Sequence, residues 1–219
     1  MSLFHFLTEY YPTLFVWISG ITVIIVYRSS WPLSFKILAL FILIYTLTDT
    51  YGNVMAAFYK KNNHFVYNIL YSFQFIIISL FFYYHLNRGL MKKIIIYFFF
   101  IFPLFVLTNT IWFQDIQNLQ TFSYVFGGSF VILLAVAYLW QLYVSEETRS
   151  IFRDPIFWFS LAWLLNFAVT VPYFGMLNYL IKNFPVLALN YYILVIDISD
   201  CLRNILLTIG FLWMGVAKK

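Results

Sequence analysis

The sequence predicts an all-α, polytopic membrane protein with seven transmembrane helices, its N-terminus outside and its C-terminus in the cytoplasm. Of the 219 residues, 63% are hydrophobic and only 10% are charged, whereas soluble domains are typically about 25% charged. Apolar runs long enough to cross a bilayer follow one another with short connections. Basic residues are distributed unequally between alternate connections, which sets the orientation. We expect one domain, 1–219, in the inner membrane, with no soluble domain.

Seven apolar runs approach the length of about 20 residues that a transmembrane helix needs. The first is the shortest, and its helix could begin a turn earlier, at Leu7. The opening segment MSLFHFLTEYYPTLF lacks a basic region and a small-residue cleavage site, so we expect no cleaved signal peptide. The predicted spans are 12–27, 37–59, 65–85, 94–113, 122–144, 156–181 and 186–214.

Basic residues in the connections predict the orientation of the chain, because cytoplasmic loops carry an excess of Lys and Arg. The connections on one side contain Lys60, Lys61 and Lys182. Those on the other side contain a larger set: Arg28, Lys36, Arg88, Lys92, Lys93, Arg149, Arg153, Lys218 and Lys219. The second side is therefore predicted to be cytoplasmic.

Charged side chains inside two of the apolar runs mark the predicted functional site. An ionised group near the bilayer centre costs about 2.5–3.5 kcal/mol on insertion scales, so such groups need partners within the protein. Spans two, three, six and seven carry polar side chains at helical spacing, and these faces are expected to turn toward one another in lipid. The predicted ligand-binding residues are Asp49, Asn53, Asn68, Gln74, Asn166, Tyr173, Asp197, Asp200, Arg203 and Asn204.

The charges in this predicted cluster do not balance. Asp49, Asp197 and Asp200 are three acids, and Arg203 is the one base. If Arg203 pairs with one carboxylate, the others are left to carry a proton, bind a cation or cationic ligand, or contact water. A purely structural Asp–Arg lock is the competing interpretation, since polar groups also hold membrane helices together.

Several classes of membrane protein are excluded or disfavoured by missing residues. Covalent retinal needs a lysine in the seventh helix, and that run has none, so we predict no cofactor. The topology resembles that of rhodopsins and G-protein-coupled receptors only in architecture, because span three ends in YYHLNRG and span seven in LTIGFLWMG. No HxxxH zinc pair occurs, and IDISD departs from the YD and GxGD motifs of intramembrane aspartyl proteases. The basic residues lie at helix ends, so nucleic acid is not expected as a partner.

The chain ends in NILLTIGFLWMGVAKK, an apolar run followed by a short basic tail, and is rich in Ile, Phe, Tyr, Asn and Lys. In length, composition and this last segment it resembles small multi-span membrane proteins of Bacteroidota that are often encoded beside, or fused to, sensor histidine kinases. The resemblance implies a sensor or regulatory membrane subunit that signals through a partner such as a histidine kinase. It implies no catalytic residue.

The predicted function is receptor-like: the buried polar site binds a small or amphiphilic ligand, and a partner protein transmits the signal. Two alternatives remain open. Acids within the membrane also suit a proton- or cation-coupled transporter, although no internal repeat or paired broken helices are visible. An intramembrane lipid hydrolase that uses paired aspartates is the third possibility, and we expect binding rather than catalysis.

Overall fold

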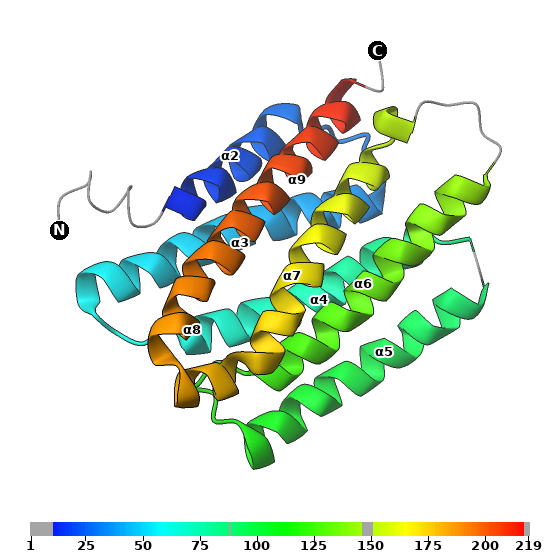
Figure 1. Ribbon diagram of the computed structural model, residues 1–219. Helices are drawn as coiled ribbons and strands as arrows, with labels where there is room; N and C mark the ends of the chain where they lie inside the picture. The colour runs from blue at the N-terminus through cyan, green and yellow to red at the C-terminus, as the bar shows by residue number, and fades with distance from the viewer. Residues whose placement is uncertain (1–10, 88, 146–150, 217–219) are drawn as a thin grey trace.

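The computed structural model describes residues 11–87, 89–145 and 151–216 and is built entirely from helices (Figure 1). Helix accounts for 89% of the chain, and no strand occurs in the described ranges. The elements are α2 (Tyr11–Val26), α3 (Leu33–Tyr59), α4 (His64–His85), α5 (Gly89–Thr108), η1 (Asn109–Phe113), α6 (Thr121–Val144), η2 (Ile151–Arg153), α7 (Pro155–Asn183), α8 (Pro185–Tyr191), η3 (Tyr192–Asp197) and α9 (Ile198–Val216).

Five of these helices are long and apolar enough to cross a membrane, namely α3, α4, α5 with η1, α6 and α7. This confirms the prediction of an all-helical chain suited to several membrane crossings. Helix α2 is apolar but has only 16 residues, about 24 Å of helix, against a hydrocarbon core of about 30 Å. The predicted earlier start at Leu7 lies outside the described residues.

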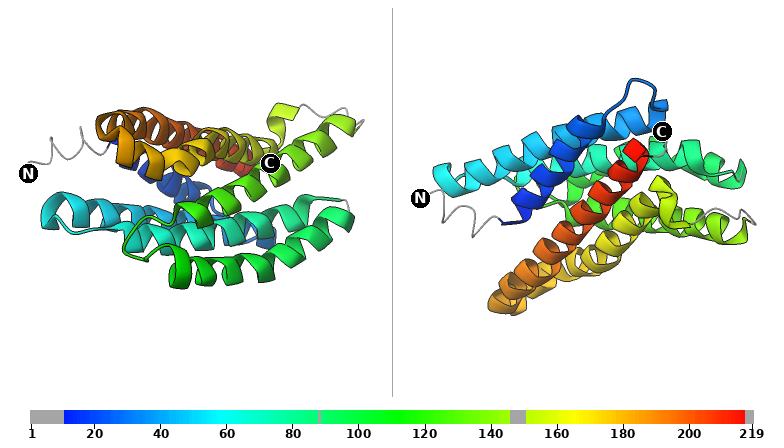
Figure 2. Two further views of the ribbon diagram at one scale, coloured as in Figure 1. Left: turned by 60° about the horizontal axis from the view of Figure 1, so that its bottom comes forward. Right: turned by 90° about the horizontal axis from the view of Figure 1, so that it is seen from above.

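Six helices form a closed ring, and α5 lies outside it (Figures 1 and 2). Around the ring, α2 packs on α3, α3 on α4, α4 on α6, α6 on α7, α7 on α9, and α9 returns to α2. Helix α5 packs mainly on α4, and only 22% of its most apolar window is buried, against 44–50% for the four other long helices. Helix α5 therefore contributes less to the interior than the ring helices do.

The predicted seventh span is not one uniform α-helix. Residues 186–214 were expected to form a single helix, but the chain forms α8, then the π-helical segment η3, then α9. Pro185 stands at the first position of α8, where its missing N–H costs nothing. π-Helical turns are rare in proteins, and those that occur are frequently found at functional sites. The π-helical turn changes the angular spacing around Asp197, the last residue of η3, so helical spacing alone could not place this side chain.

The basic connections gather at one end of the bundle, because successive helices run in opposite directions. Among the described residues, Arg28, Lys36 and Arg153 lie in or beside connections at the end where α9 finishes. Lys60 and Lys182 lie at the opposite end, with the α3–α4 connection and α8 (Figure 1). The unequal numbers of basic residues in alternate connections of the sequence therefore correspond to unequal numbers at the two ends of the bundle.

Close packing of α6 against its neighbours depends on glycine. A Cβ atom added at Gly127 would clash with the ring of Phe75. That ring is 1% exposed and cannot move aside, because Phe102, Tyr124 and Phe167 surround it. In contrast, a Cβ atom at Gly175 on α7 would lie at an ordinary 3.8 Å from Val125.

We therefore expect Gly127→Ala to destabilise the bundle by about 1–3 kcal/mol through overpacking. Gly175→Ala is the matched control, and it is expected to leave stability unchanged or raise it slightly, since alanine favours helix. Thermal unfolding of both variants in the same detergent measures the difference. Equal melting temperatures would show that α6 does not approach α4 as closely as the structure has it.

Candidate ligand-binding site

A cavity of about 460 Å³ lies among the ring helices toward the end of the bundle that carries α8, and η3 and α8 also line it. We call it the inner chamber. All three aspartates of the predicted cluster, Asp49, Asp197 and Asp200, line it, and no Lys or Arg of the described residues does. Four tyrosines and one phenylalanine also line it: Tyr45, Tyr67, Tyr71, Tyr192 and Phe174. The chamber is therefore both acidic and rich in ring faces.

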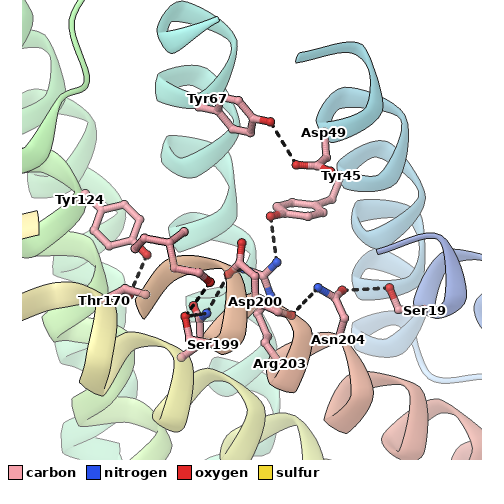
Figure 3. Close-up of polar contacts among 12 residues, drawn as sticks. Ser19, Tyr45, Asp49, Tyr67, Tyr124, Thr170, Ser199, Asp200, Arg203 and Asn204 are labelled. Atoms are coloured by element: carbon pink, nitrogen blue, oxygen red, sulfur yellow. Dashed lines mark hydrogen bonds and ion pairs between the residues drawn. The ribbon is translucent and has the colours of Figure 1, made fainter. Parts of the chain in front are cut away.

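Asp49 is held by neutral donors from three helices. Its Oδ2 accepts hydrogen bonds from Thr13 Oγ1 of α2, at 3.3 Å, and from Asn53 Nδ2 of α3, at 3.1 Å. The Tyr67 hydroxyl of α4 donates to Oδ1 at 3.1 Å and also lies 3.0 Å from Asn53 Oδ1 (Figure 3). These bonds satisfy both oxygens and fix the carboxyl group, but none of them supplies a positive charge.

Asp200 is paired with a cation. Its Oδ1 lies 3.1 Å from Arg203 Nη1, one helical turn later, and accepts a hydrogen bond from Asn166 Nδ2 of α7 at 2.9 Å. Arg203 is 5% exposed, and its Nη2 donates to the Tyr45 hydroxyl at 2.8 Å. The guanidinium carbon also lies 4.9 Å from the centre of the Tyr45 ring (Figure 3). This network ties α9 to α3 and α7.

Asp197 has neither a hydrogen bond nor an ion pair to its carboxylate from the residues that the structure describes. It is half-buried and lines the inner chamber from η3. Among the described residues Arg203 is the one cation in contact with the cluster, and it is committed to Asp200 and Tyr45. Two of the three acids thus face the chamber without a cationic partner.

The predicted site residues therefore separate by position. Asp49, Asn53, Asp197 and Asp200 line the inner chamber together. Arg203 and Asn166 do not line the chamber themselves, but both contact the Asp200 carboxylate, which does.

Asn204 also lies behind the chamber. Its Nδ2 donates to the Asp200 carbonyl at 2.8 Å, and its Oδ1 accepts from Ser19 of α2 (Figure 3). Gln74 does not reach the inner chamber. It shares with Arg203 and Asn204 a separate hole of about 10 Å³, which is about the space of one water molecule.

Two predicted residues lie elsewhere. Tyr173 donates to the Ala188 carbonyl at 3.0 Å and lines a second cavity, described below. Asn68 holds the connection between η1 and α6: its Nδ2 donates to the carbonyls of Ile116 and Asn118, and its Oδ1 accepts from the Gln120 amide. In the structure, then, the role of Asn68 is to fix a loop.

We expect Asn68→Ala to cost about 1–3 kcal/mol, because it removes three hydrogen bonds at a side chain that is only 6% exposed. Hydrogen exchange of the amides of residues 114–120 should accelerate in this variant. Asn62→Ala is the control, since Asn62 is exposed, donates to the Gln117 carbonyl of the same loop and accepts from the His64 amide, and it should cost less than Asn68→Ala because water can replace its bonds. Equal effects of the two substitutions would contradict the assigned role.

A second cavity of about 530 Å³ adjoins the inner chamber, and we call it the outer chamber. It lies at the same end of the bundle and is lined by the η1–α6 connection, the end of α7, and α8. The two chambers share four lining residues: His64, Leu119, Leu189 and Tyr192. Asp115, an exposed residue of the connection, is the one acid of its described lining.

Several site residues were missed by sequence reasoning. Thr13 and Ser19 belong to the first span, where two hydroxyls among apolar residues give little signal. Tyr45 and Tyr192 are tyrosines in a chain that contains 18 of them, so composition cannot single them out. Thr13, Val16, Ser19 and Val23, all buried in α2, follow one another at spacings of three and four residues, and this helical spacing is the signal that could have found Thr13 and Ser19.

Within the described residues, no group of three or more His, Cys, Asp or Glu side chains could hold a metal ion. Comparison of the chain with protein-family models, with curated proteins and with solved structures gave no match. The functional interpretation therefore depends on the chambers and on the side chains that line them.

Proposed function

We propose that this protein is a seven-span, receptor-like membrane protein whose inner chamber binds a small amphiphilic cation. The observation that carries the proposal is the charge of the chamber: three aspartates line it, and Arg203, the one cation that the described residues bring to them, is already paired with Asp200. Burying uncompensated charge is expensive in a membrane, so such residues mark functional sites. A bound cation would supply the missing positive charge.

The aromatic walls support an organic cation over a bare metal ion. A cation within about 6 Å of a tyrosine ring centre is attracted by the ring face, and quaternary ammonium ligands are recognised in this way. Tyr45 already holds the Arg203 guanidinium against its ring. Tyr67, Tyr71 and Tyr192 supply further rings around the same space.

The proposed orientation places both chambers on the outer side of the membrane. They lie at the end of the bundle that carries Lys60 and Lys182, away from the larger set of basic residues. The positive-inside rule makes that end the external one. The spans would be α2, α3, α4, α5 with η1, α6, α7, and the last helical stretch from α8 to α9, which gives an external N-terminus and a cytoplasmic C-terminus in the inner membrane.

Helix α9 is the element best placed to carry a signal. It contributes Asp200 and Arg203 near the chamber, and its Phe211, toward the other end, packs against Trp31 and Phe159 with ring centres 6.1 and 4.9 Å apart. A ligand that draws Asp197 and Asp200 toward Asp49 would shift the start of α9 against α3. We propose that a partner protein such as a histidine kinase reads this shift at the cytoplasmic end.

Binding is tested with tetramethylammonium and with tert-butanol, an uncharged molecule of similar size, on protein in nanodiscs. Isothermal titration should show saturable binding of the ammonium ion and none of the alcohol. The kinase encoded nearest to this protein, reconstituted beside it, should change its autophosphorylation rate when tetramethylammonium is added. Binding of both molecules with equal affinity would show that the acidic charge does not select the ligand.

Two other functions have specific support and make different predictions. The π-helical break beside Asp197 resembles the interrupted helices of transporters, and transport predicts proton or cation flux into liposomes under an imposed gradient. Asp49 and Asp200 line one chamber from different helices, as a pair of catalytic carboxyls would. Hydrolysis predicts turnover of a lipid in a phospholipid and lysolipid panel, with loss of turnover in both Asp49→Asn and Asp200→Asn.

A further inference from the structure

The two chambers together have room for a longer ligand than either chamber alone. The inference drawn from this rests on the proposed function. They share His64, Leu119, Leu189 and Tyr192, so a molecule that passes these four residues occupies both spaces. The inner chamber holds the acids. The outer chamber is lined by uncharged polar groups, among them Gln114, Asn118 and Asn178, together with apolar side chains.

We infer that the ligand is a two-part molecule, with an ammonium group in the inner chamber and an uncharged, partly apolar extension in the outer chamber. This assignment follows from the unequal distribution of acidic side chains between the two chambers. Three aspartates line the inner space, whereas Asp115, at an exposed position, is the one acid that the described residues contribute to the outer space. A cation is therefore held deep in the bundle, and the extension points toward the external face.

The junction between the chambers contains a polar group without a partner. His64 is half-buried and lines both chambers, and its buried Nδ1 forms no hydrogen bond with any residue that the structure describes. A polar atom in the middle of the ligand would satisfy it. Tyr192 stands at the same junction, on the π-helical segment, so η3 contacts both halves of the ligand.

The outer chamber can be filled without touching the acids. Ile181 lines the outer chamber only, is 56% exposed, and lies near the end of α7. Replacing it by tryptophan adds bulk at a position where the fold tolerates it. Leu187 on α8 is a matched control, because it is also an exposed apolar residue at this end of the bundle and lines neither chamber.

The test is a series of alkyltrimethylammonium ions, from tetramethyl- to hexyltrimethylammonium, titrated into the wild type, Ile181→Trp and Leu187→Trp in nanodiscs. Each buried methylene is expected to strengthen binding by about twofold to fourfold, so affinity should rise at least tenfold along the series in the wild type and in Leu187→Trp. In Ile181→Trp the affinity should stop rising after the ions with the shortest alkyl chains, while tetramethylammonium binds as in the wild type. Circular dichroism and monodispersity check that each variant is folded.

The outcomes separate this inference from the proposed function. A rise of equal size in Ile181→Trp overturns the two-chamber ligand, because the extension would then be in lipid or elsewhere on the protein. An unchanged affinity along the series in the wild type overturns it as well, and both results leave the cation site intact. Tetramethylammonium binding that is absent, or that survives Asp49→Asn undiminished, overturns the proposed function itself.

Discussion

Arg203→Leu is expected to lower the free energy of unfolding by about 3–5 kcal/mol, more than Gly127→Ala or Asn68→Ala. Removing one partner of a buried ion pair leaves the other charge uncompensated, and that is the main cost. Asp200 would lose its cation, and the Tyr45 hydroxyl would lose its donor at 2.8 Å. Reversible unfolding in mixed micelles measures the change.

The double variant Asp200→Asn/Arg203→Leu is the control that separates charge from packing. If the uncompensated Asp200 carboxylate causes the loss, the double variant should recover at least half of it, because residue 200 then carries no charge that needs Arg203 as its partner. Two additive losses would instead mean that each side chain acts through its own contacts, and that the ion pair does not join α9 to the rest of the bundle.

Asp49→Asn should have the largest effect on binding. We expect it to weaken the binding of tetramethylammonium by at least about 30-fold, or about 2 kcal/mol. The substitution removes the carboxylate that would form a largely desolvated charge pair with the bound cation. The substitution keeps the size of the side chain and much of its hydrogen bonding to Thr13, Asn53 and Tyr67. The fold should therefore survive, and the change isolates charge.

Asp154→Asn provides the matched control for this charge change. Asp154 caps the start of α7 at the opposite end of the bundle, where its Oδ1 accepts from the Ile156 amide at 2.9 Å and its Oδ2 accepts from the Tyr138 hydroxyl at 2.7 Å. Asparagine is an equally good cap, and its amide group can donate to the Tyr138 oxygen, so this variant should fold and bind as the wild type does. If both variants lost affinity alike, the net charge of the protein, rather than Asp49 in the chamber, would govern binding.

Much of the fold was predictable because lipid imposes simple rules. Apolar length and the exclusion of bare polar groups from hydrocarbon are readable in runs such as 122–144, which becomes α6. The break within the last predicted span was not predictable, because the residues of η3, YILVID, contain neither Gly nor Pro. Its π-helical turn depends on packing that a single sequence does not show.

The charged residues of the candidate site were predictable from the sequence, whereas most of its tyrosines were not. Asp49, Asp197 and Asp200 stand out in an apolar run, and the structure brings all three to one chamber. Asn68 follows the same polar spacing but fixes a loop instead. Helical spacing assigns a residue to a face; it cannot say whether that face meets a cavity or a connection.

The acidity and accessibility of the chamber can be measured with two adjacent tyrosines. Tyr191 and Tyr192 are 42% and 43% exposed, but only Tyr192 lines the chambers. Each is changed to cysteine in a Cys201→Ser background, since Cys201 is the single native cysteine. Whole cells then receive membrane-impermeant methanethiosulfonate reagents, one carrying a trimethylammonium group and one a sulfonate.

If the chamber is acidic and open to the outside, the cationic reagent should modify Tyr192→Cys at least about tenfold faster than the anionic one. Tetramethylammonium should slow that reaction, and Asp49→Asn should remove most of the charge preference. Tyr191→Cys should react without protection by tetramethylammonium. Equal rates of the two reagents at Tyr192→Cys, with no protection, would contradict the central claim that this protein binds an organic cation in an external acidic chamber.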